Sequence, residues 1–448
     1  MTEGPILKNM IRFVIPLMAS SLLQLLYNAA DMVLVGQFAG SAALAAVGAT
    51  SMLITLLVNL FLGFSVGANV IVAQYLGAGQ QKQVEESVHT AVLMALLSGI
   101  GTGLVGIILA RPLLVMMNTP ADILDSAVLY ITIYFCGMPA VLLYDFCAAI
   151  LRAVGDTKRP LYYLTVSGIL NVLLNLLFVI VFSMDVAGVA LATVISQLVS
   201  MVLIIRCLLR MEGSVRLNPR RLHLHRDKVR QIMKIGLPAG LQSAMFSISN
   251  LIIQSSINSF GAAAIAGNTI AANIEGFVST PLSAYFQAAT SFSSQAYGAG
   301  KPERIGKIGK CAAGLLIAEG FVTGLLAACF ARPLLGIYTS DPAVIEWGLI
   351  RMWMLVTTCF IADTGDVFVS CLRGMGNSLM PMLLSILCTC GFRILWIAAV
   401  FAAFPTEVML YLCYPLSWTL ATAVDFSYYM WYKKKVIAAE GTGEGRIL

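Results

Sequence analysis

Long apolar segments, repeated along nearly the whole chain, constrain this sequence more than any other feature. A helix of about 20 apolar residues crosses a bilayer, and twelve segments reach that length. They are continuous rather than alternating between apolar and polar residues, which excludes an outer-membrane barrel. We therefore predict an all-α polytopic membrane protein whose twelve transmembrane helices lie at 11–37, 43–74, 87–110, 128–150, 160–182, 187–210, 234–259, 264–296, 311–331, 347–371, 380–402 and 407–432.

Composition agrees with that prediction, and the basic residues orient the helices. Only 11% of the 448 residues are charged, against about 25% in a typical soluble domain. All but four of the 28 lysines and arginines lie near the termini or in connectors on the same side as the termini. Because cytoplasmic connectors carry an excess of these residues, we expect both termini in the cytoplasm and the protein in the cell membrane. The exceptions are Arg111, Arg332, Arg351 and Arg393.

An internal repeat divides the twelve helices into two sets of six. The stretch LRAVGDTKRP at 151–160 matches LRGMGNSLMP at 372–381, which corresponds to a sequence offset of 221. In the first helix of each set the offset is 222, where Pro16 matches Pro238. One offset kept over several helices indicates a duplicated unit rather than chance similarity. The glycine-containing part of each stretch is typical of a turn at the end of a helix.

The repeat predicts the domain organisation. We expect an N-lobe at 1–210, a cytoplasmic basic linker at 211–233 and a C-lobe at 234–448. Since each set contains an even number of helices, the two lobes should be related by a pseudo-twofold axis along the membrane normal. Such a build places a central cavity between the lobes and is typical of a transporter that works by alternating access.

The first apolar segment carries the most unusual polar residues. Asp31 lies within a bilayer-length apolar run, where a charge is costly and therefore indicates a functional role. Gln24 and Asn28 precede it by seven and three residues, so the three side chains share one helix face. Pro16 predicts a hinge in the same helix. The second half repeats the asparagine as Asn250, but has isoleucine in place of the acid.

With these motifs in view, the chain resembles the multidrug and toxic compound extrusion family over nearly all its length. The resemblance rests on the first-helix pattern, on the GAG turns at 77–79 and 298–300, and on the two stretches that end at Pro160 and Pro381. It implies an antiporter, and not an enzyme, that exports a small organic compound, cationic or amphiphilic, in exchange for H⁺ or Na⁺. We accordingly expect a monomer in the lipid bilayer, with no cofactor other than the coupling ion and no nucleic-acid partner.

The resemblance also implies a cation site in the N-lobe. The family's first-helix aspartate corresponds to Asp31, its fifth-helix pair to Asn171 and Asn175, and its sixth-helix threonine to Thr193. A carboxylate, two amide oxygens and a hydroxyl suit a small hard cation such as Na⁺. Some members have a second acid at the place of Asn175, so both H⁺ and Na⁺ stay open as the coupling ion. The alternative interpretation is structural, with these residues as polar contacts between helices.

Candidates for the substrate cavity come from the remaining intramembrane polar residues. One branch of the family has a glutamate on the seventh helix, where this chain has Phe246, which argues against that branch's cation site in the C-lobe. Asp366 matches Asp145 in the repeat, which also allows a shared structural role. The candidate cavity residues are Gln24, Asn28, Glu275, Asp363 and Asp366.

Two other classes of function fit the sequence less well than export. A flippase for lipids or lipid-linked precursors would need a basic cavity, whereas the interior charges here are mostly acidic, with Arg351 and Arg393 as exceptions. An intramembrane enzyme that binds a metal through Asp363 and Asp366 would need a second acid-rich motif, which the sequence lacks. The flippase is therefore the second hypothesis.

Overall fold

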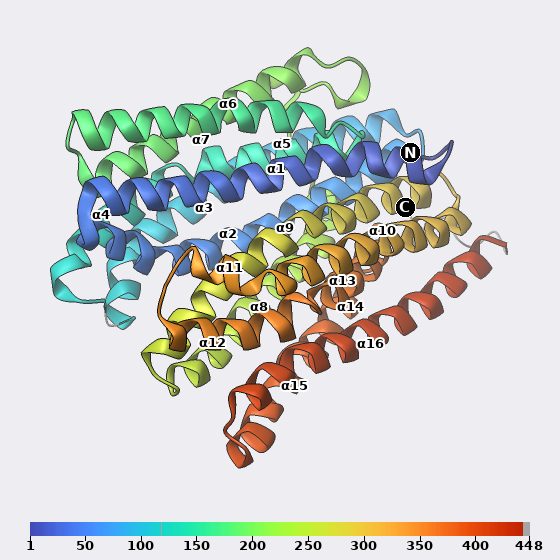
Figure 1. Cartoon of the computed structure of the whole chain (residues 1–448). Coiled ribbons are helices and arrows are strands. Elements are labelled where there is room, and N and C mark those ends of the chain that lie inside the picture. Colours follow the sequence, from blue (N-terminus) through green and yellow to red (C-terminus); the bar gives the residue numbers. More distant parts are fainter. Residues whose placement is uncertain (118, 442–448) are drawn as a thin grey trace. The chain divides into compact units, whose positions relative to one another are not determined.

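The structure consists of α-helices joined by short connectors (Figure 1). The computed structural model describes residues 1–117 and 119–441, and within these ranges it contains no β-strand. The first half holds α1 (Ile6–Leu34), α2 (Gly40–Gly77), α3 (Gln81–Met116), α4 (Ala121–Cys136), α5 (Met138–Ala153), α6 (Lys158–Asn175) and α7 (Asp185–Arg210). The second half holds α8 (Arg226–Asn258), α9 (Ala262–Gly298), α10 (Pro302–Cys329), α11 (Ala331–Gly336), α12 (Pro342–Arg351), α13 (Cys359–Gly374), α14 (Leu379–Ser385), α15 (Phe392–Trp396) and α16 (Glu407–Gly441).

Each of the twelve predicted spans coincides with a helix or with consecutive helices. Among the described residues, eight helices are long and apolar enough to cross a membrane, and nine if α4 and α5, which meet at a 46° bend, form one span. The other three predicted spans are α8, α9 and α16, which are long enough but contain more polar residues. The all-α polytopic membrane fold is confirmed.

Short π-helical segments interrupt several of these helices, a feature that the sequence analysis did not predict. A π-turn inserts an extra residue and often marks a functional site. Two such segments flank α15, so the stretch that carries Arg393 is not a regular helix. In the described residues the segments are Val35–Ala39, Leu176–Val181, Met352–Val356, Ile386–Gly391 and Ile397–Phe401.

The chain folds into two compact units that exchange segments. The N-unit consists of Ala19–Gly240, and the C-unit consists of Met1–Met18 together with the chain from Leu241 onward. The long helices α1 and α8 each belong to both units, because α1 changes unit after Met18 and α8 after Gly240. Each change comes two residues after a proline that the repeat pairs, Pro16 and Pro238.

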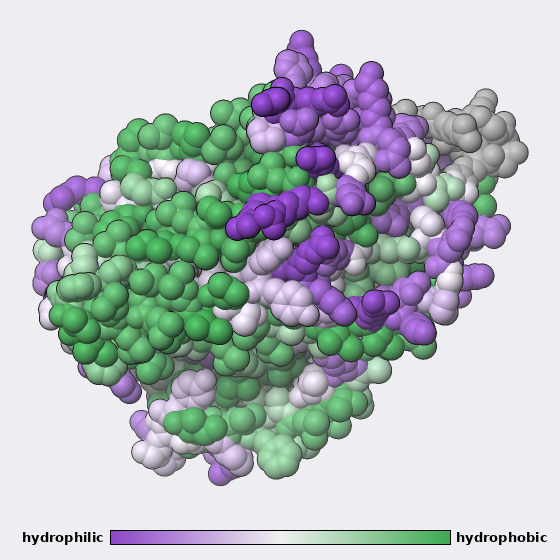
Figure 2. All heavy atoms as spheres, turned by 90° about the horizontal axis from the view of Figure 1, so that it is seen from above, coloured by the Kyte–Doolittle hydropathy of each residue, from purple (hydrophilic) through white to green (hydrophobic). Residues whose placement is uncertain are grey.

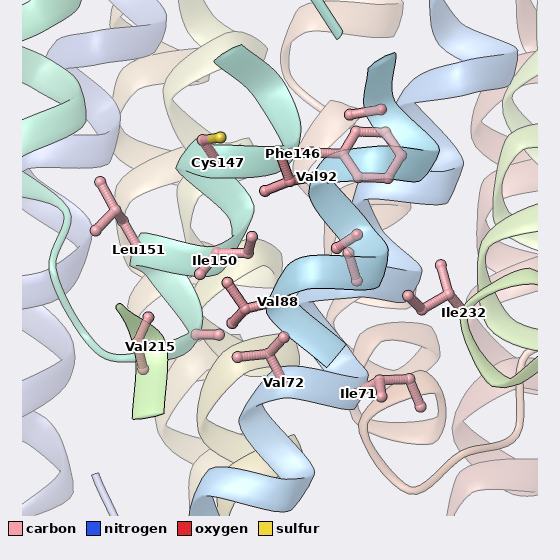
Figure 3. Packing of buried hydrophobic residues seen from close by; sticks show 14 of the residues in the cluster. Ile71, Val72, Val88, Val92, Phe146, Cys147, Ile150, Leu151, Val215 and Ile232 are labelled. Atoms are coloured by element: carbon pink, nitrogen blue, oxygen red, sulfur yellow. The ribbon is translucent and has the colours of Figure 1, made fainter. Parts of the chain in front are cut away.

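The core of the N-unit lies where α2, α3 and α5 pack together (Figure 3). Val72 of α2, Val88 of α3 and Ile150 of α5 are fully buried in it. Small residues such as Ala91 and Ala95 on the buried face of α3 let the neighbouring helices approach closely.

The connector between α7 and α8 packs onto the N-unit rather than extending from it. Val215 is buried in the core shown in Figure 3. The backbone N–H of Asn218 donates to Nε2 of His89 on α3 at 3.0 Å. Because α8 begins at Arg226, the last eight residues of the predicted linker at 211–233 are helical.

The first residues of the chain are packed into the C-unit. Phe13 of α1 meets Phe292 of α9 edge to face, with ring centroids 5.4 Å apart. The guanidinium of Arg304 donates to the backbone carbonyls of Met1, Glu3 and Gly4 at 2.9–3.2 Å. These contacts hold the beginning of α1 against α9 and α10.

The turns after α5 and α13 have the same conformation in the two halves. Gly155 and Gly376, which the predicted repeat pairs, have φ angles of +93° and +84°. Their N–H groups donate to the carbonyls of Arg152 and Arg373 at 3.0 and 2.9 Å. A residue without Cβ is required at such positive φ values. The helix-end turn predicted for 151–160 is confirmed.

Hydrophobic side chains cover broad areas of the surface in Figure 2, and hydrophilic side chains gather toward one side of that view. Ile108 and Leu395 are each 70% exposed, and Val181 is 67% exposed. A water-soluble protein rarely exposes large contiguous apolar areas, so this surface fits contact with lipid.

Candidate functional site

Asp31 is part of a polar cluster inside the N-unit. Its Oδ1 accepts a hydrogen bond from Nδ2 of Asn175 at 2.6 Å. The same Nδ2 donates to Oδ1 of Asn171 at 3.3 Å, and Nδ2 of Asn171 donates to Oγ1 of Thr193 at 3.5 Å. The structure thus brings together, from α1, α6 and α7, the four residues that the resemblance assigned to one site.

A close contact between α1 and α6 sets the spacing of this cluster. A Cβ added to Gly168 would overlap Cε2 of Tyr27, so the tyrosine ring occupies the space of a side chain. The Tyr27 hydroxyl also donates to the carbonyl of Thr165 at 3.4 Å. Tyr27 lies one turn before Asp31 and Gly168 two turns before Asn175. The contact therefore brings the carboxylate within reach of the amide.

The donor atoms of the cluster suit a proton or a small hard cation. Oδ1 of Asn175 is buried and has no hydrogen-bond partner among the described residues. A buried oxygen without a partner is costly unless a ligand satisfies it. The described residues contain no group of three or more His, Cys, Asp or Glu side chains that could hold a metal ion. Any ion held here would therefore depend on Asp31 together with amide and hydroxyl oxygens.

The other polar residues of the first helix have different surroundings. Gln24 and Asn28 are exposed, whereas Asp31 is half-buried. The helix face predicted to carry these three side chains therefore faces more than one environment. Pro16 is buried, and α1 continues as a helix through it to the point after Met18 where it changes unit.

The C-unit contains a cavity of about 320 Å³. Two predicted residues, Glu275 and Asp366, line it, as does Phe246. Asp363 is not among the described lining residues, although its Oδ2 is buried without a hydrogen-bond partner in the described part of the chain. Polar residues from several helices complete the wall, including Asn250, Gln254, Asn268, Arg351, Arg393 and Asp425.

Arg351 and Glu275 form a buried ion pair at this cavity. Their Nη2 and Oε2 atoms are 2.7 Å apart, and the side chains are 10% and 17% exposed. Nη1 of Arg351 also donates to Oδ1 of Asn268 at 2.5 Å, and that oxygen accepts a second bond from the Tyr411 hydroxyl at 3.2 Å. The charge of Glu275 is therefore compensated by a neighbouring side chain.

Arg393 is buried in the same cavity without such compensation. The residue is 4% exposed, and no carboxylate of a described residue lies within 4 Å of its nitrogens. Its Nε donates to Oγ of Ser417 and its Nη1 to Oδ1 of Asn250, both at 3.0 Å. Its guanidinium carbon lies 4.2 Å from the centre of the Tyr414 ring. This arrangement holds a positive charge in place by polar and cation–π contacts alone.

Asp425 is the cavity acid that sequence reasoning missed. Its Oδ2 accepts from Oγ of Ser385 at 3.1 Å, whereas Oδ1 is buried without a partner among the described residues. The sequence contains a signal for it, because Asp425 lies inside the predicted span 407–432, where a charge is as costly as it is at Asp31. Arg393 is a basic residue within a predicted apolar span, but no local sequence pattern indicates that it lines this cavity.

Apolar helices that enclose a polar cluster around a carboxylate, together with a separate charged cavity, are typical of a polytopic membrane transporter. The model of the MatE family matches residues 16–177 and 238–425, and this chain belongs to that family. The two matched segments begin at the prolines that the predicted repeat pairs.

Relatives of known description cover nearly the whole chain. It is 25% identical over 443 residues to the probable multidrug resistance protein YoeA of Bacillus subtilis, with 96% of this chain and 95% of that protein covered. It is also 25% identical to the probable multidrug resistance protein NorM of Thermotoga maritima, with coverages of 84% and 82%. The fold matches a solved MOP superfamily transporter from Pyrococcus furiosus with a TM-score of 0.90, 21% identity and 96% of each chain covered.

Proposed function

We propose that this protein is an antiporter that exports organic compounds, cationic or amphiphilic, in exchange for H⁺ or Na⁺. The observation that carries the proposal is the cluster in which Asn175 donates to Asp31 while a buried amide oxygen stays without a partner among the described residues. The relatives described as probable multidrug resistance proteins support export as the direction of transport. On this proposal the protein acts as a monomer in the cell membrane, with both termini in the cytoplasm and no cofactor beyond the coupling ion.

The cluster offers a route from ion binding to movement. Protonation of Asp31, or Na⁺ binding to it, neutralises the carboxylate and changes its bond to Asn175 on α6. That change alters the preferred position of α1, in which Pro16 lies just before the change of unit after Met18. An ion drives alternating access only if its affinity differs between the two states, because a ligand shifts the equilibrium toward the state that it binds more tightly.

The test uses purified full-length protein in liposomes with the fluorescent cation ethidium. A pH gradient and a Na⁺ gradient are imposed separately on wild type and on Asp31→Asn. We expect one gradient to drive transport by the wild type and neither to drive it in the variant, because the substituted amide side chain cannot be protonated or carry a charge. The gradient that drives transport identifies the coupling ion.

The matched control is Asp122→Asn, which removes a carboxylate from the exposed first turn of α4. It should transport at the wild-type rate. Full gradient-driven transport by Asp31→Asn would contradict the coupling role. Failure of both gradients to move ethidium in the wild type would contradict a cationic substrate.

A second candidate function is a flippase for lipids or lipid-linked precursors. Two buried arginines, Arg351 and Arg393, line the C-unit cavity, and of these two only Arg351 is paired with a described carboxylate. The Pyrococcus furiosus transporter is described as having a binding pocket of reverse polarity that suggests a different function for it. A scrambling assay with fluorescent lipids in the same liposomes separates this function from ethidium export.

A further inference from the structure

The cavity of the C-unit has two charged ends at a fixed separation. Two antiparallel stretches form one wall, because Ser385 bonds to Asp425 and, eight residues further along, Arg393 bonds to Ser417. Ser417 and Asp425 are also eight residues apart within α16. At about 1.5 Å per residue this places the two levels roughly 12 Å apart along the helix.

The end at Arg393 can accept an anion. Its bonds to Asn250 and Ser417 use two of the five N–H groups of a guanidinium. The planar fork of an arginine matches a carboxylate or phosphate, and a buried positive charge is stabilised by such a partner. Tyr414 and Trp418 lie beside it, with ring centres 4.2 and 5.9 Å from the guanidinium carbon. They provide an apolar and aromatic wall next to the charge.

The end at Asp425 can accept a cation. The residue is 3% exposed, and of its two carboxylate oxygens only Oδ2 has a hydrogen-bond partner among the described residues. A second acid, Asp366, lines the same cavity. An ammonium group would satisfy the buried oxygen.

We propose that this cavity binds an amphiphilic molecule with oppositely charged ends, its anionic group on Arg393 and its ammonium group on Asp425. The apolar stem would lie along the α16 face formed by Trp418, Ala421 and Thr422, which line the cavity between the two ends. This inference deepens the proposed function by naming a class of substrate, and it rests on that function only for transport, not for binding.

The first experiment measures binding by calorimetry, with no gradient, to full-length protein in phosphatidylglycerol nanodiscs. The probes are 8-aminooctanoate, octanoate, octylammonium and the short 4-aminobutanoate, with empty nanodiscs subtracted. We expect 8-aminooctanoate to bind about tenfold or more tightly than each of the others, because only it reaches both charged ends. Equal affinity for the four probes, or no binding of 8-aminooctanoate, would overturn the proposal.

Variants then assign the two ends. In Arg393→Gln the affinity for 8-aminooctanoate should fall to that for octylammonium, whereas in Asp425→Asn it should fall to that for octanoate. Arg332→Gln, which alters an arginine 70% exposed on α11, is the matched control and should bind as the wild type does. Because a misfolded variant loses affinity for every probe, the probe-specific losses distinguish binding from folding. Unchanged affinity in both cavity variants would overturn the assignment.

Two further measurements separate the sources of such a ligand and the two proposals. The two charges of phosphatidylethanolamine are separated by only two carbons, less than in 4-aminobutanoate, so nanodiscs of that lipid should not weaken 8-aminooctanoate binding. Weaker binding there would contradict the long separation between the two ends. Equal binding in the two lipids would support a soluble ligand. Asp31→Asn should keep wild-type affinity for 8-aminooctanoate. A failed coupling test therefore does not contradict ligand binding in the C-unit cavity.

Discussion

The N-unit and the C-unit bury charge in apolar helices by opposite means. In the N-unit the charge is a carboxylate, Asp31, which accepts a hydrogen bond from a neighbouring amide. The C-unit cavity contains carboxylates as well, but it also holds a guanidinium, Arg393, which lies against an aromatic ring and donates to uncharged oxygens. A carboxylate can exchange a proton in the range where cells work, whereas a guanidinium stays charged. This difference is the basis on which we propose coupling for the N-unit site and ligand binding for the C-unit site.

The two sites involve stretches that the predicted repeat pairs. α6 begins at Lys158 and α14 begins at Leu379, which keeps the offset of the predicted repeat. The same offset pairs Asn171 and Asn175 with Phe392 and Trp396. These two rings stack with centroids 5.7 Å apart, where the N-unit has its two amides. The π-helical segment Ile386–Gly391 interrupts the second stretch where α6 is continuous, so the two sites differ in local backbone as well as in side chains.

The largest effect is expected when the N-unit is given the apolar character of the C-unit at one of these positions. Asn175→Leu removes the donor to Asp31 and should lower gradient-driven ethidium transport by about 10–100-fold, as loss of a supporting contact to an ion site often does. Initial transport rates at matched protein amounts measure it. The comparison variant Asn250→Leu changes a contact of Arg393 in the C-unit and should leave ion coupling in place. Loss of ion coupling in Asn250→Leu but not in Asn175→Leu would contradict the assignment of coupling to the N-unit.

A second variant tests how the C-unit tolerates its charges. Glu275→Gln leaves Arg351 buried without its ion-pair partner and should lower the free energy of unfolding by about 3–5 kcal/mol. Chemical unfolding in bicelles measures the change. The double variant Glu275→Gln/Arg351→Met removes both charges and should recover most of the loss. If the double variant is as unstable as the single one, the pair does not compensate the buried charge.

A third variant sharpens the account of how the N-unit cluster is positioned. Gly168→Ala places a methyl group where the Tyr27 ring lies, so α1 must move away from α6. Overpacking of this kind costs about 1–3 kcal/mol of stability and should reduce transport together with it. Gly101→Ala on α3 is the matched control, since a Cβ there meets nothing within 4 Å. Restoration of transport by the added change Tyr27→Leu would identify the ring as the obstacle.

The smallest effect is expected at an exposed ion pair, which gives the baseline for the buried charges. Arg111 and Asp125 are 3.2 Å apart with side chains 62% and 83% exposed. Water screens such a pair, so Asp125→Asn should change the free energy of unfolding by less than about 1 kcal/mol. The same bicelle measurement checks it. If the free energy of unfolding falls as much as it does in Glu275→Gln, burial does not explain the difference between the two ion pairs.

Much of the N-unit site could be predicted because its signals are local. Asp31 was selected by the cost of a charge in an apolar span, and the family resemblance supplied Asn171, Asn175 and Thr193, which the structure brings together. Their role as an ion site stays a prediction. The C-unit cavity was only partly predicted, because Arg393 and Asp425 come from different helices and their meeting depends on how α15 packs against α16.

The sequence by itself determined that this chain spans a membrane as helices, where those helices lie, and which acid interrupts the first of them. It could do so because a bilayer imposes a fixed length and a high cost of polar groups, and both can be counted along the chain. Only the tertiary structure decided that Met1–Met18 pack in the C-unit, that Glu275 is paired with Arg351, and that Arg393 is not paired with a carboxylate of the described residues. Those outcomes depend on the register of helices distant in sequence, and that register is set by side-chain packing over the whole unit.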